Sequence, residues 1–493
     1  MRKRLLLILL SAALFLPACS SASTDGNSDS ADITGMQDGI IDGGENIEAA
    51  AVTVESVLAG LPDADYEGYI FTVMTANMSH GGEFEWRQAP EETETGEPIN
   101  DALFRRARLI EEKYNINFEY IIENDVGAMA NTAQRTVRSG DNAFDIVIGE
   151  MINVTRALAQ AGHVYDFVDF PNVDLSQPWW VQNAMRDLMI NNRFFFPTGD
   201  ITPRYVLGPY FLMFNKTLFA DRGLEIPYNK VLGGTWTLDE LYDLTKDQTR
   251  DLNGDGVIII EDDFFGMFNA GFTAYAMMVS SGENIIGTEN GNPFVSVGNE
   301  RSMNIIARIT DILTAGDIYY STDYEVFDEY RVFSSGRALF IGQTAAILHM
   351  YRDMDHEYGV IPLPKFDLAQ ENYYSYSQPW DSAALSVPIT NENTERTGMI
   401  VEAMAAVGKY TSTPAQYNIT LQTKFSRDEY TPVMLDIICE TATFDLGHIY
   451  NFGGVFDALN NSLHSNTPFV SQLESILPRM EAEIERTINS FAE

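Results

Sequence analysis

The segment DLNGDGVIIIEDD, residues 251–263, places oxygen-bearing side chains at the spacing of a calcium-binding loop. Such loops take ligands from positions one, three, five, seven (a backbone carbonyl) and twelve, around a glycine at position six. The residues at the five ligand positions are Asp251, Asn253, Asp255, Val257 (through its carbonyl) and Asp262. The following residues, DDFFGMF, have a strand pattern, whereas a calcium sensor needs a second helix. We therefore expect a structural calcium ion; an acidic turn without metal is the alternative.

Aromatic and acidic side chains near predicted strand ends indicate a sugar-binding site. The chain has 5 Trp, 23 Tyr and 29 Phe. Flat rings stack on the apolar faces of sugar rings, while carboxylates and amides hydrogen-bond the hydroxyls. Trp380 and Asp381 precede a predicted strand at 384–387, although Trp380 could instead pack in a hinge. The candidate ligand-binding residues are Asn77, Trp86, Glu150, Asp200, Trp380 and Asp381.

No catalytic motif accompanies these residues. The sequence contains no HExxH, GxSxG or GxxxxGK[ST] pattern, and its 6 histidines have no metal-binding spacing. A glycoside hydrolase would need two carboxylates about 5–10 Å apart, one with a raised pKa, and acidic residues are plentiful. Without a local signature for that pair, we expect a binding protein with no catalytic residues, and keep a secreted glycoside hydrolase as the alternative.

The amino terminus has the pattern of an export signal. Basic residues 2–4 precede an apolar run, 5–16, that is shorter than the roughly 20 residues needed to span a bilayer. The sequence LPAC then resembles a bacterial lipobox, in which Cys19 becomes the lipidated first residue; an ordinary cleaved signal is the alternative. We predict a signal peptide at 1–18, a flexible tether at 19–65 that is rich in Gly, Ser, Asp and Asn, and a location on the extracellular face of the membrane.

Composition limits the remaining possibilities. The 493 residues are 45% hydrophobic, enough for a large core divided into two domains. The formal net charge of −40 argues against nucleic-acid binding, because phosphates would be repelled. Cys439 is the only cysteine besides Cys19, so no internal disulfide is expected. Because Cys439 lies in the apolar segment VMLDIICET, we expect a buried, inert thiol.

From residue 66 onward, strand and helix patterns alternate. Strand-like runs at 69–75, 116–122 and 144–149 are separated by amphipathic helical patterns, the first with Asn100 as its expected N-cap. This alternation predicts an α/β fold with parallel sheets covered on both faces. Ligands of such sheets bind beyond the carboxyl ends of the strands, which is where Glu150 lies.

Four segments, in order and over residues 66–406, carry a resemblance to a known family. They are SGDNAFDIVIGE (139–150), YFLMFNKTLFADRGLEIPY with GTWTLDEL (210–241), FSSGRALFIGQ (333–343) and YGVIPLPKFD (358–367). Together with the lipobox, they resemble the lipid-anchored extracellular solute-binding proteins of bacterial ABC importers, in particular the maltose-type oligosaccharide binders.

The resemblance implies a two-lobed, periplasmic-binding-protein-like fold with a ligand cleft between lobes joined by several hinge crossovers. Lobe one would comprise 66–206 plus 338–405, and lobe two 207–337 plus 406–493. The family implies a monomer that binds a carbohydrate and passes it to a membrane permease. A binder of the same fold for a peptide, polyamine or anion remains the alternative. An anion binder would need several basic side chains at one site, and only 31 basic residues are present in the chain.

Overall fold

A computed structural model describes most of the chain. The described residues are 52–76, 88–269, 272–289, 291–314, 318–320, 328–422, 428–464 and 468–491. Several sequence predictions therefore lie outside them: the signal peptide at 1–18, the tether as far as residue 51, the lipidation site Cys19, and the candidate ligand-binding residues Asn77 and Trp86.

Within these residues, four strands form the first sheet. They are, in spatial order, β12 (Ala383–Ser386), β3 (Ile146–Glu150), β1 (Tyr69–Ala76) and β2 (Ile116–Glu123). The strands β1, β2 and β3 run parallel, and β12 is antiparallel to β3. Every residue of β3 is buried, since it lies between two strands and under helices on both faces, which explains its continuous apolar sequence.

Five described strands form the second sheet. Their order is β10 (Tyr358–Pro362), β4 (Tyr210–Asn215), β9 (Ala338–Thr344), β5 (Phe265–Asn269) and β8 (Ile318–Tyr320). Only β4 runs against its neighbours. Two smaller described sheets pair β11 (Ser375–Tyr376) with β13 (Ala442–Thr443), and β6 (Ile286–Glu289) with β7 (Asn292–Val295).

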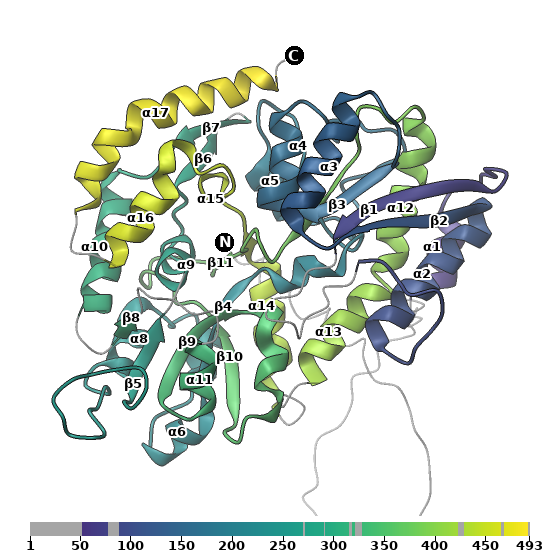
Figure 1. The fold of residues 1–493 in the computed structure, drawn as a ribbon. Coiled ribbons are helices and arrows are strands. Elements are labelled where there is room, and N and C mark those ends of the chain that lie inside the picture. The colour runs from purple at the N-terminus through teal and green to yellow at the C-terminus, as the bar shows by residue number, and fades with distance from the viewer. Residues whose placement is uncertain are drawn as a thin grey trace, which may run out of the picture.

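The two large sheets occupy different parts of the molecule, so the two-lobed α/β prediction is confirmed (Figure 1). In each sheet the antiparallel strand is the one that enters from the other lobe: β4 follows the first crossover and β12 the second. The two crossover segments contact each other, because Gln378 donates its backbone N–H to the Gly208 carbonyl at 2.8 Å. A Cβ at Gly208 would lie 2.0 Å from Ser382 Oγ, so a larger residue there would displace this buried serine side chain.

The pairing corrects the predicted lobe boundary at residue 338. Both β9 and β10 pair with β4, so residues 338–362 belong to the second sheet rather than to lobe one. The chain returns to the first sheet only between β10 and β12. The prediction was wrong because the apolar runs of β9 and β10 fit either sheet; only their partners, which are distant in sequence, distinguish the two.

Helices surround both sheets. Those packed with the first sheet, or on one another beside it, are α1 (Val54–Gly60), α2 (Pro98–Tyr114), α3 (Val126–Arg138), α4 (Arg156–Gln160), α12 (Thr394–Gly408), α13 (Ser412–Gln422) and the short helix η1 (Met151–Thr155). Those of the second lobe are α6 (Lys216–Asp221), α7 (Tyr228–Leu232), α8 (Leu238–Thr245), α9 (Thr273–Ser280), α10 (Glu300–Thr314), α11 (Asp328–Ser334), α14 (Tyr430–Glu440), α16 (Val455–His464) and α17 (Phe469–Ser490). Between them lie α5 (Gln182–Leu188), α15 (Leu446–Tyr450), η2 (Pro203–Leu207), η3 (Ala345–Asp353) and η5 (Phe452–Gly454).

Three helical details differ from the sequence predictions. The predicted tether contains α1, which begins with a Thr53–Ser56 capping box and packs on α12, so the tether assignment is wrong for 54–60. The N-cap of α2 is Glu97 rather than Asn100, because a proline at the first helical position starts the helix earlier. Helix α13 contacts α2 and η2, so residues 412–422 lie against lobe one, although they were assigned to lobe two.

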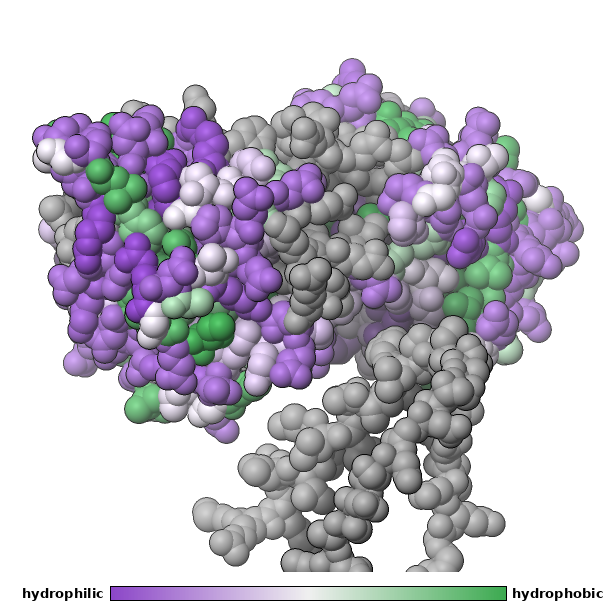
Figure 2. All heavy atoms as spheres, turned by 90° about the horizontal axis from the view of Figure 1, so that it is seen from below, coloured by the Kyte–Doolittle hydropathy of each residue, from purple (hydrophilic) through white to green (hydrophobic). Residues whose placement is uncertain are grey.

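The surface fits the strongly acidic composition. On the face shown in Figure 2, the coloured residues are mainly hydrophilic, and the hydrophobic ones form small, separate groups. In the described part of the chain, no helix is both long and apolar enough to cross a membrane.

Candidate functional site

The two sheets present one set of polar side chains to each other. Glu150 ends β3 of the first sheet and pairs with Ala383, the first residue of β12. Asp381 lies two residues before that strand, and its Oδ2 accepts a 2.8 Å hydrogen bond from Thr344, the last residue of β9 in the second sheet. The carboxyl ends of strands from both sheets therefore meet around Glu150 and Asp381, where ligands of open α/β sheets bind.

Buried charges of both signs surround these carboxylates. Glu150 and Asp381 are 2% and 9% exposed, and Arg204 of η2 is also buried and donates from Nη2 to the Trp380 carbonyl at 2.8 Å. Burial raises the pKa of Glu150 to about 7; hydrogen bonds from Asn153 and the charge of Arg204 oppose this shift, and the charge of Asp381 adds to it. Burial lowers the pKa of Arg204 to about 10, so its guanidinium remains charged at neutral pH.

Arg156 at the start of α4 adds a second guanidinium. Its charge acts on Glu150, and its Nη1 donates to the Ile449 carbonyl at 3.0 Å, which links α4 to α15. Two carboxylates and two guanidinium groups thus share the site, and their formal charges balance. We refer to Glu150, Arg156, Arg204, Trp380 and Asp381 as the interlobe cluster.

Two partly exposed rings provide an apolar surface beside these charges. The Trp380 and Phe272 rings have centroids 5.1 Å apart, inclined by 43°. Trp380 precedes β12 of the first sheet, whereas Phe272 precedes α9 and follows β5 of the second. A planar apolar ligand face held between polar edges is the chemistry that this arrangement suits.

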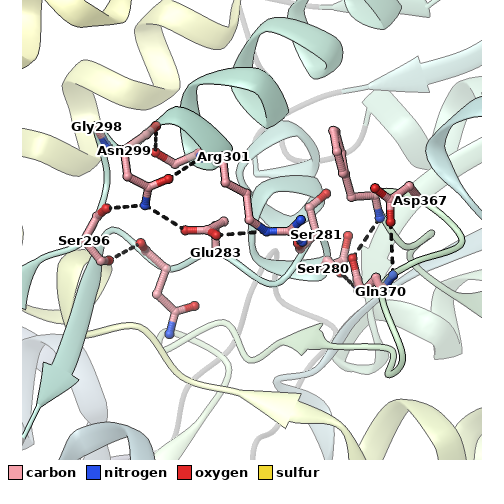
Figure 3. Close-up of polar contacts among 12 residues, drawn as sticks. Ser280, Ser281, Glu283, Ser296, Gly298, Asn299, Arg301, Asp367 and Gln370 are labelled. Atoms are coloured by element: carbon pink, nitrogen blue, oxygen red, sulfur yellow. Dashed lines mark hydrogen bonds and ion pairs between the residues drawn. The ribbon is translucent and has the colours of Figure 1, made fainter.

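A hydrogen-bond network fixes the far end of α9, the helix that begins after Phe272. Ser280 Oγ donates to the Pro364 carbonyl at 2.9 Å. Gln370 Nε2 donates to the Ser280 carbonyl at 2.7 Å (Figure 3). Arg301 of α10 donates to the Ser281 carbonyl at 2.9 Å and pairs with Glu283 at 3.1 Å. The helix is therefore tied to the segment after β10 and to α10, which holds its start in place.

The structure brings together Glu150, Trp380 and Asp381 but places Asp200 elsewhere. Asp200 accepts from the Tyr205 hydroxyl at 3.1 Å and lies 3.7 Å from Lys409 Nζ, just after α12. Burial raises its pKa, against the charge of Lys409. Its described contacts are to η2, α12 and α13 rather than to the interlobe cluster. We therefore assign it to packing beside the crossover.

Sequence reasoning missed Arg156, Arg204 and Phe272. Arg204 lies only four residues after Asp200, in FFFPTGDITPRY. The two side chains have different partners, since Arg204 contacts Trp380 whereas Asp200 contacts Lys409. The position of Arg204 directly before the predicted crossover was the one sequence feature that could have identified it as a site residue. Arg156 and Phe272 had none, because each comes from a helix start that only the fold brings to the site.

The other tryptophans serve packing. Trp179 and Trp180 donate from their Nε1 atoms to the two carboxylate oxygens of Glu402, each at 3.0 Å. This anchors the loop before α5 to α12. Trp236 is fully buried at the start of α8 and donates to the Pro362 carbonyl at 3.0 Å, as its assignment to helix-start packing predicted.

Cys439, in α14, is a partly exposed residue, but its thiol is buried, and this burial raises the pKa of the thiol to about 12. The thiolate that a nucleophile requires is therefore absent at neutral pH, in agreement with the predicted inert thiol.

The predicted calcium loop lies between α8 and β5, which gives the expected helix–loop–strand order. Asp255 Oδ2 and Asp262 Oδ2 lie 3.2 and 3.5 Å from Asn253 Nδ2, whereas the Asp251 carboxylate accepts backbone N–H bonds from Gly254 and Gly256. In the described ranges, no three acidic, His or Cys side chains are grouped to hold a metal ion. The donor types suit calcium, but the three carboxylates do not share one centre, and the calcium ion stays a prediction.

The buried closing residue of this loop is Asp263, one position beyond the predicted twelfth ligand. Its carboxylate accepts from the backbone N–H groups of Leu252 and Ile259 at 2.9 and 2.8 Å. The loop is thus held closed by a side chain that sequence reasoning did not consider.

No protein-family model and no curated protein sequence matches the chain. Solved structures do. UspC of Mycobacterium tuberculosis is 12% identical with a TM-score of 0.57, over 84% of this chain and 99% of UspC. A cyclo/maltodextrin-binding protein complexed with maltotetraose is 14% identical with a TM-score of 0.56, over 85% and 99% of the two chains.

The ABC substrate-binding protein Lmo0181 from Listeria monocytogenes, in complex with cycloalternan, is 13% identical with a TM-score of 0.50, over 86% and 99%. At such identities the likeness concerns the fold. The protein therefore has the two-lobed α/β fold of these substrate-binding proteins, as its sequence motifs predicted.

Proposed function

We propose that the protein is the extracellular, lipid-anchored solute-binding component of an ABC importer, and that it captures a carbohydrate, specifically an oligosaccharide, for a membrane permease. The observation that carries the proposal is the interlobe cluster, whose buried charges and Trp380 ring meet Thr344 and Phe272 of the second lobe. A ligand that touches both lobes stabilises their closed arrangement.

The charges favour a neutral ligand. When Glu150 is ionised, two carboxylates and two guanidinium groups leave no excess of either sign for an anion or a polyamine. Sugar hydroxyls both donate and accept hydrogen bonds, so they can pair with carboxylates and guanidinium groups alike. Two proteins of the same fold are described with carbohydrate ligands, maltotetraose and cycloalternan, which supports the same ligand class here.

A secreted glycoside hydrolase is the second candidate, because Glu150 has a pKa near 7 and lies close to Asp381. A carboxyl of raised pKa beside a second carboxylate is what such enzymes use. Both groups are largely buried, however, and Arg204 lies close to each of them, which suits hydroxyl binding better than attack on a glycosidic bond.

One experiment separates these candidates. The purified protein is melted with a panel of linear and cyclic oligosaccharides, a peptide mixture, a polyamine and phosphate, and each sugar is then recovered and analysed. We expect stabilisation by one class of oligosaccharide, which is recovered intact. Cleaved sugar would establish the hydrolase, and stabilisation only by a non-sugar compound would contradict the carbohydrate proposal.

We expect the Cys19→Ser variant to leave the membrane fraction. The predicted lipobox identifies Cys19 as the lipid attachment point, and serine has no thiol that could be modified. Fractionation of cells that express wild type or variant, followed by detection of the protein in membrane and soluble fractions, measures this. A variant that remains entirely in the membrane fraction would contradict the anchor.

We expect calcium to raise the melting temperature without changing ligand affinity. Binding to the native loop alone would stabilise it by about 2.7 kcal/mol at a free calcium concentration about 100 times Kd. Melting curves and sugar titrations with calcium or chelator, on wild type and Asp255→Ala, measure both effects. An unchanged wild-type melting temperature in chelator would overturn the structural ion, and a large change in sugar affinity alone would indicate a sensor.

A further inference from the structure

The ring of His448, in α15, lies directly beside the aromatic pair of the candidate site. It is 2% exposed and stacks on Phe456, with centroids 3.8 Å apart and planes inclined by 5°. Its centroid is 4.8 Å from that of Trp380, at a near-perpendicular angle of 76°, and 5.7 Å from that of Phe272. The imidazole is therefore continuous with the surface that Trp380 and Phe272 form.

Its surroundings determine where the ring carries its proton. Burial lowers the pKa of His448 to about 3, assisted by the charge of Arg156, so the imidazole is neutral. Burial raises the pKa of Tyr376 well above its usual range, so the phenol keeps its proton. The Tyr376 hydroxyl and His448 Nδ1 share a hydrogen bond.

If Nδ1 were the donor, both the Tyr376 proton and the Nε2 lone pair would lack a partner. With Tyr376 donating to Nδ1, only one group remains unpaired, because the ring proton is then on Nε2. Tyr376 thus sets the tautomer and turns Nε2 into an N–H donor.

The Nε2–H group of His448 has no hydrogen-bond partner, and two neighbouring polar groups also lack one. Within the described part of the chain, His448 Nε2, Arg156 Nε and the Tyr450 hydroxyl are buried without a hydrogen bond. The three residues are neighbours, since Arg156 donates to the Ile449 carbonyl between His448 and Tyr450. Buried polar atoms are nearly always paired, so a group of three neighbouring exceptions calls for a partner such as an ordered water or a bound ligand.

We propose that Arg156, His448 and Tyr450 form a donor subsite that binds oxygen atoms of the carbohydrate, with His448 Nε2 donating to one ring or hydroxyl oxygen. This proposal rests on the proposed function and adds which protein groups donate hydrogen bonds to the ligand and which accept them. Glu150 and Asp381 can accept hydrogen bonds from ligand hydroxyls, and the donor subsite can supply hydrogen bonds from α4 and α15. A ligand whose hydroxyls donate to the first group and accept from the second fits both.

The test measures affinity and stability separately. Wild type and variants are titrated with maltotriose, maltotetraose and the oligosaccharide that stabilises wild type most in the melting panel. His448→Phe keeps an aromatic ring against Phe456 but lacks the N–H, and should bind at least about tenfold more weakly. His448→Gln restores an N–H donor and should recover part of the loss.

A paired variant separates recognition from packing. Tyr376→Phe/His448→Phe removes both partners of the internal hydrogen bond, so its unliganded melting temperature should stay near that of wild type while its affinity remains low. Tyr376→Phe alone frees the tautomer and should weaken binding to an intermediate degree.

The outcomes are distinguishable. If wild type binds none of the oligosaccharides, the proposed function fails and the subsite with it. If wild type binds and His448→Phe binds within about twofold of it, the donor subsite is overturned and the proposed function stands. If affinity falls only in proportion to the melting temperature of each variant, including the paired one, His448 acts in packing and the proposal is likewise overturned.

Discussion

The Trp380→Ala variant should bind its oligosaccharide at least about 30-fold more weakly than wild type, because a stacked indole at the centre of a site contributes about 2 kcal/mol or more. The ring is partly exposed and touches Phe272 and His448, while the backbone carbonyl that Arg204 binds is retained in the variant. The fold should therefore persist. Isothermal titration gives the affinity, and a melting curve confirms the fold.

Trp179→Phe is the matched control for that variant. It also loses an indole N–H, but from the pair that binds Glu402 on α12, away from the interlobe cluster. We expect lower stability and unchanged affinity. If Trp380→Ala binds as tightly as wild type, Trp380 is a hinge-packing residue, and the aromatic basis of the carbohydrate proposal is lost.

Sugar affinity should fall on acidification through pH 7, and Glu150 should account for the fall. Its pKa of about 7 means that the carboxylate, the form that accepts bonds from hydroxyls, becomes the minor species below that pH. Affinity should then decrease by about tenfold per pH unit well below pH 7, or about 50-fold between pH 7 and pH 5. Titrations from pH 5 to pH 8 measure the slope.

The Glu150→Gln variant should show no such slope, whatever its absolute affinity, because an amide does not titrate in this range. A wild-type affinity that is flat from pH 5 to pH 8 would contradict an ionised Glu150 in ligand binding.

The stability of the unliganded protein should depend on Glu150 with the opposite sign. The folded pKa is above the ordinary value of 4.5, so the folded state keeps a proton that the unfolded chain releases between about pH 4.5 and pH 7. The stability associated with Glu150 is therefore fully present below pH 4.5 and is lost as pH rises to 7. The difference in melting temperature between wild type and Glu150→Gln should follow this window.

The fold class could be predicted because its signals are local. Buried runs such as 146–150 and the alternation of strands and helices depend on neighbours in sequence. The lobe boundary at 338 could not be predicted, because β9 and β10 join the second sheet by pairing with β4, which lies more than 100 residues earlier in the sequence. Likewise, the helix at 54–60 follows a polar stretch, and its packing on α12 supplies the stability that its short sequence lacks.

The candidate site was predictable where a residue lies beside a strand end. Glu150, Trp380 and Asp381 were identified in this way, and the structure groups them. Arg156 and His448 come from α4 and α15, which are distant in sequence and meet through the Ile449 carbonyl. No sequence pattern encodes that meeting, so the proposed donor subsite could be inferred only from the fold.

The late position of β12 has a consequence for how the chain reaches its folded state. Its partner β3 is synthesised early, yet Ala383 pairs with Glu150 only after every strand of the second sheet has been made. Nascent chains that end before residue 386 thus lack one edge of the first sheet, and β3 would remain an unpaired hydrophobic edge. Contacts of such long sequence separation form slowly, so the two lobes mature together rather than one after the other.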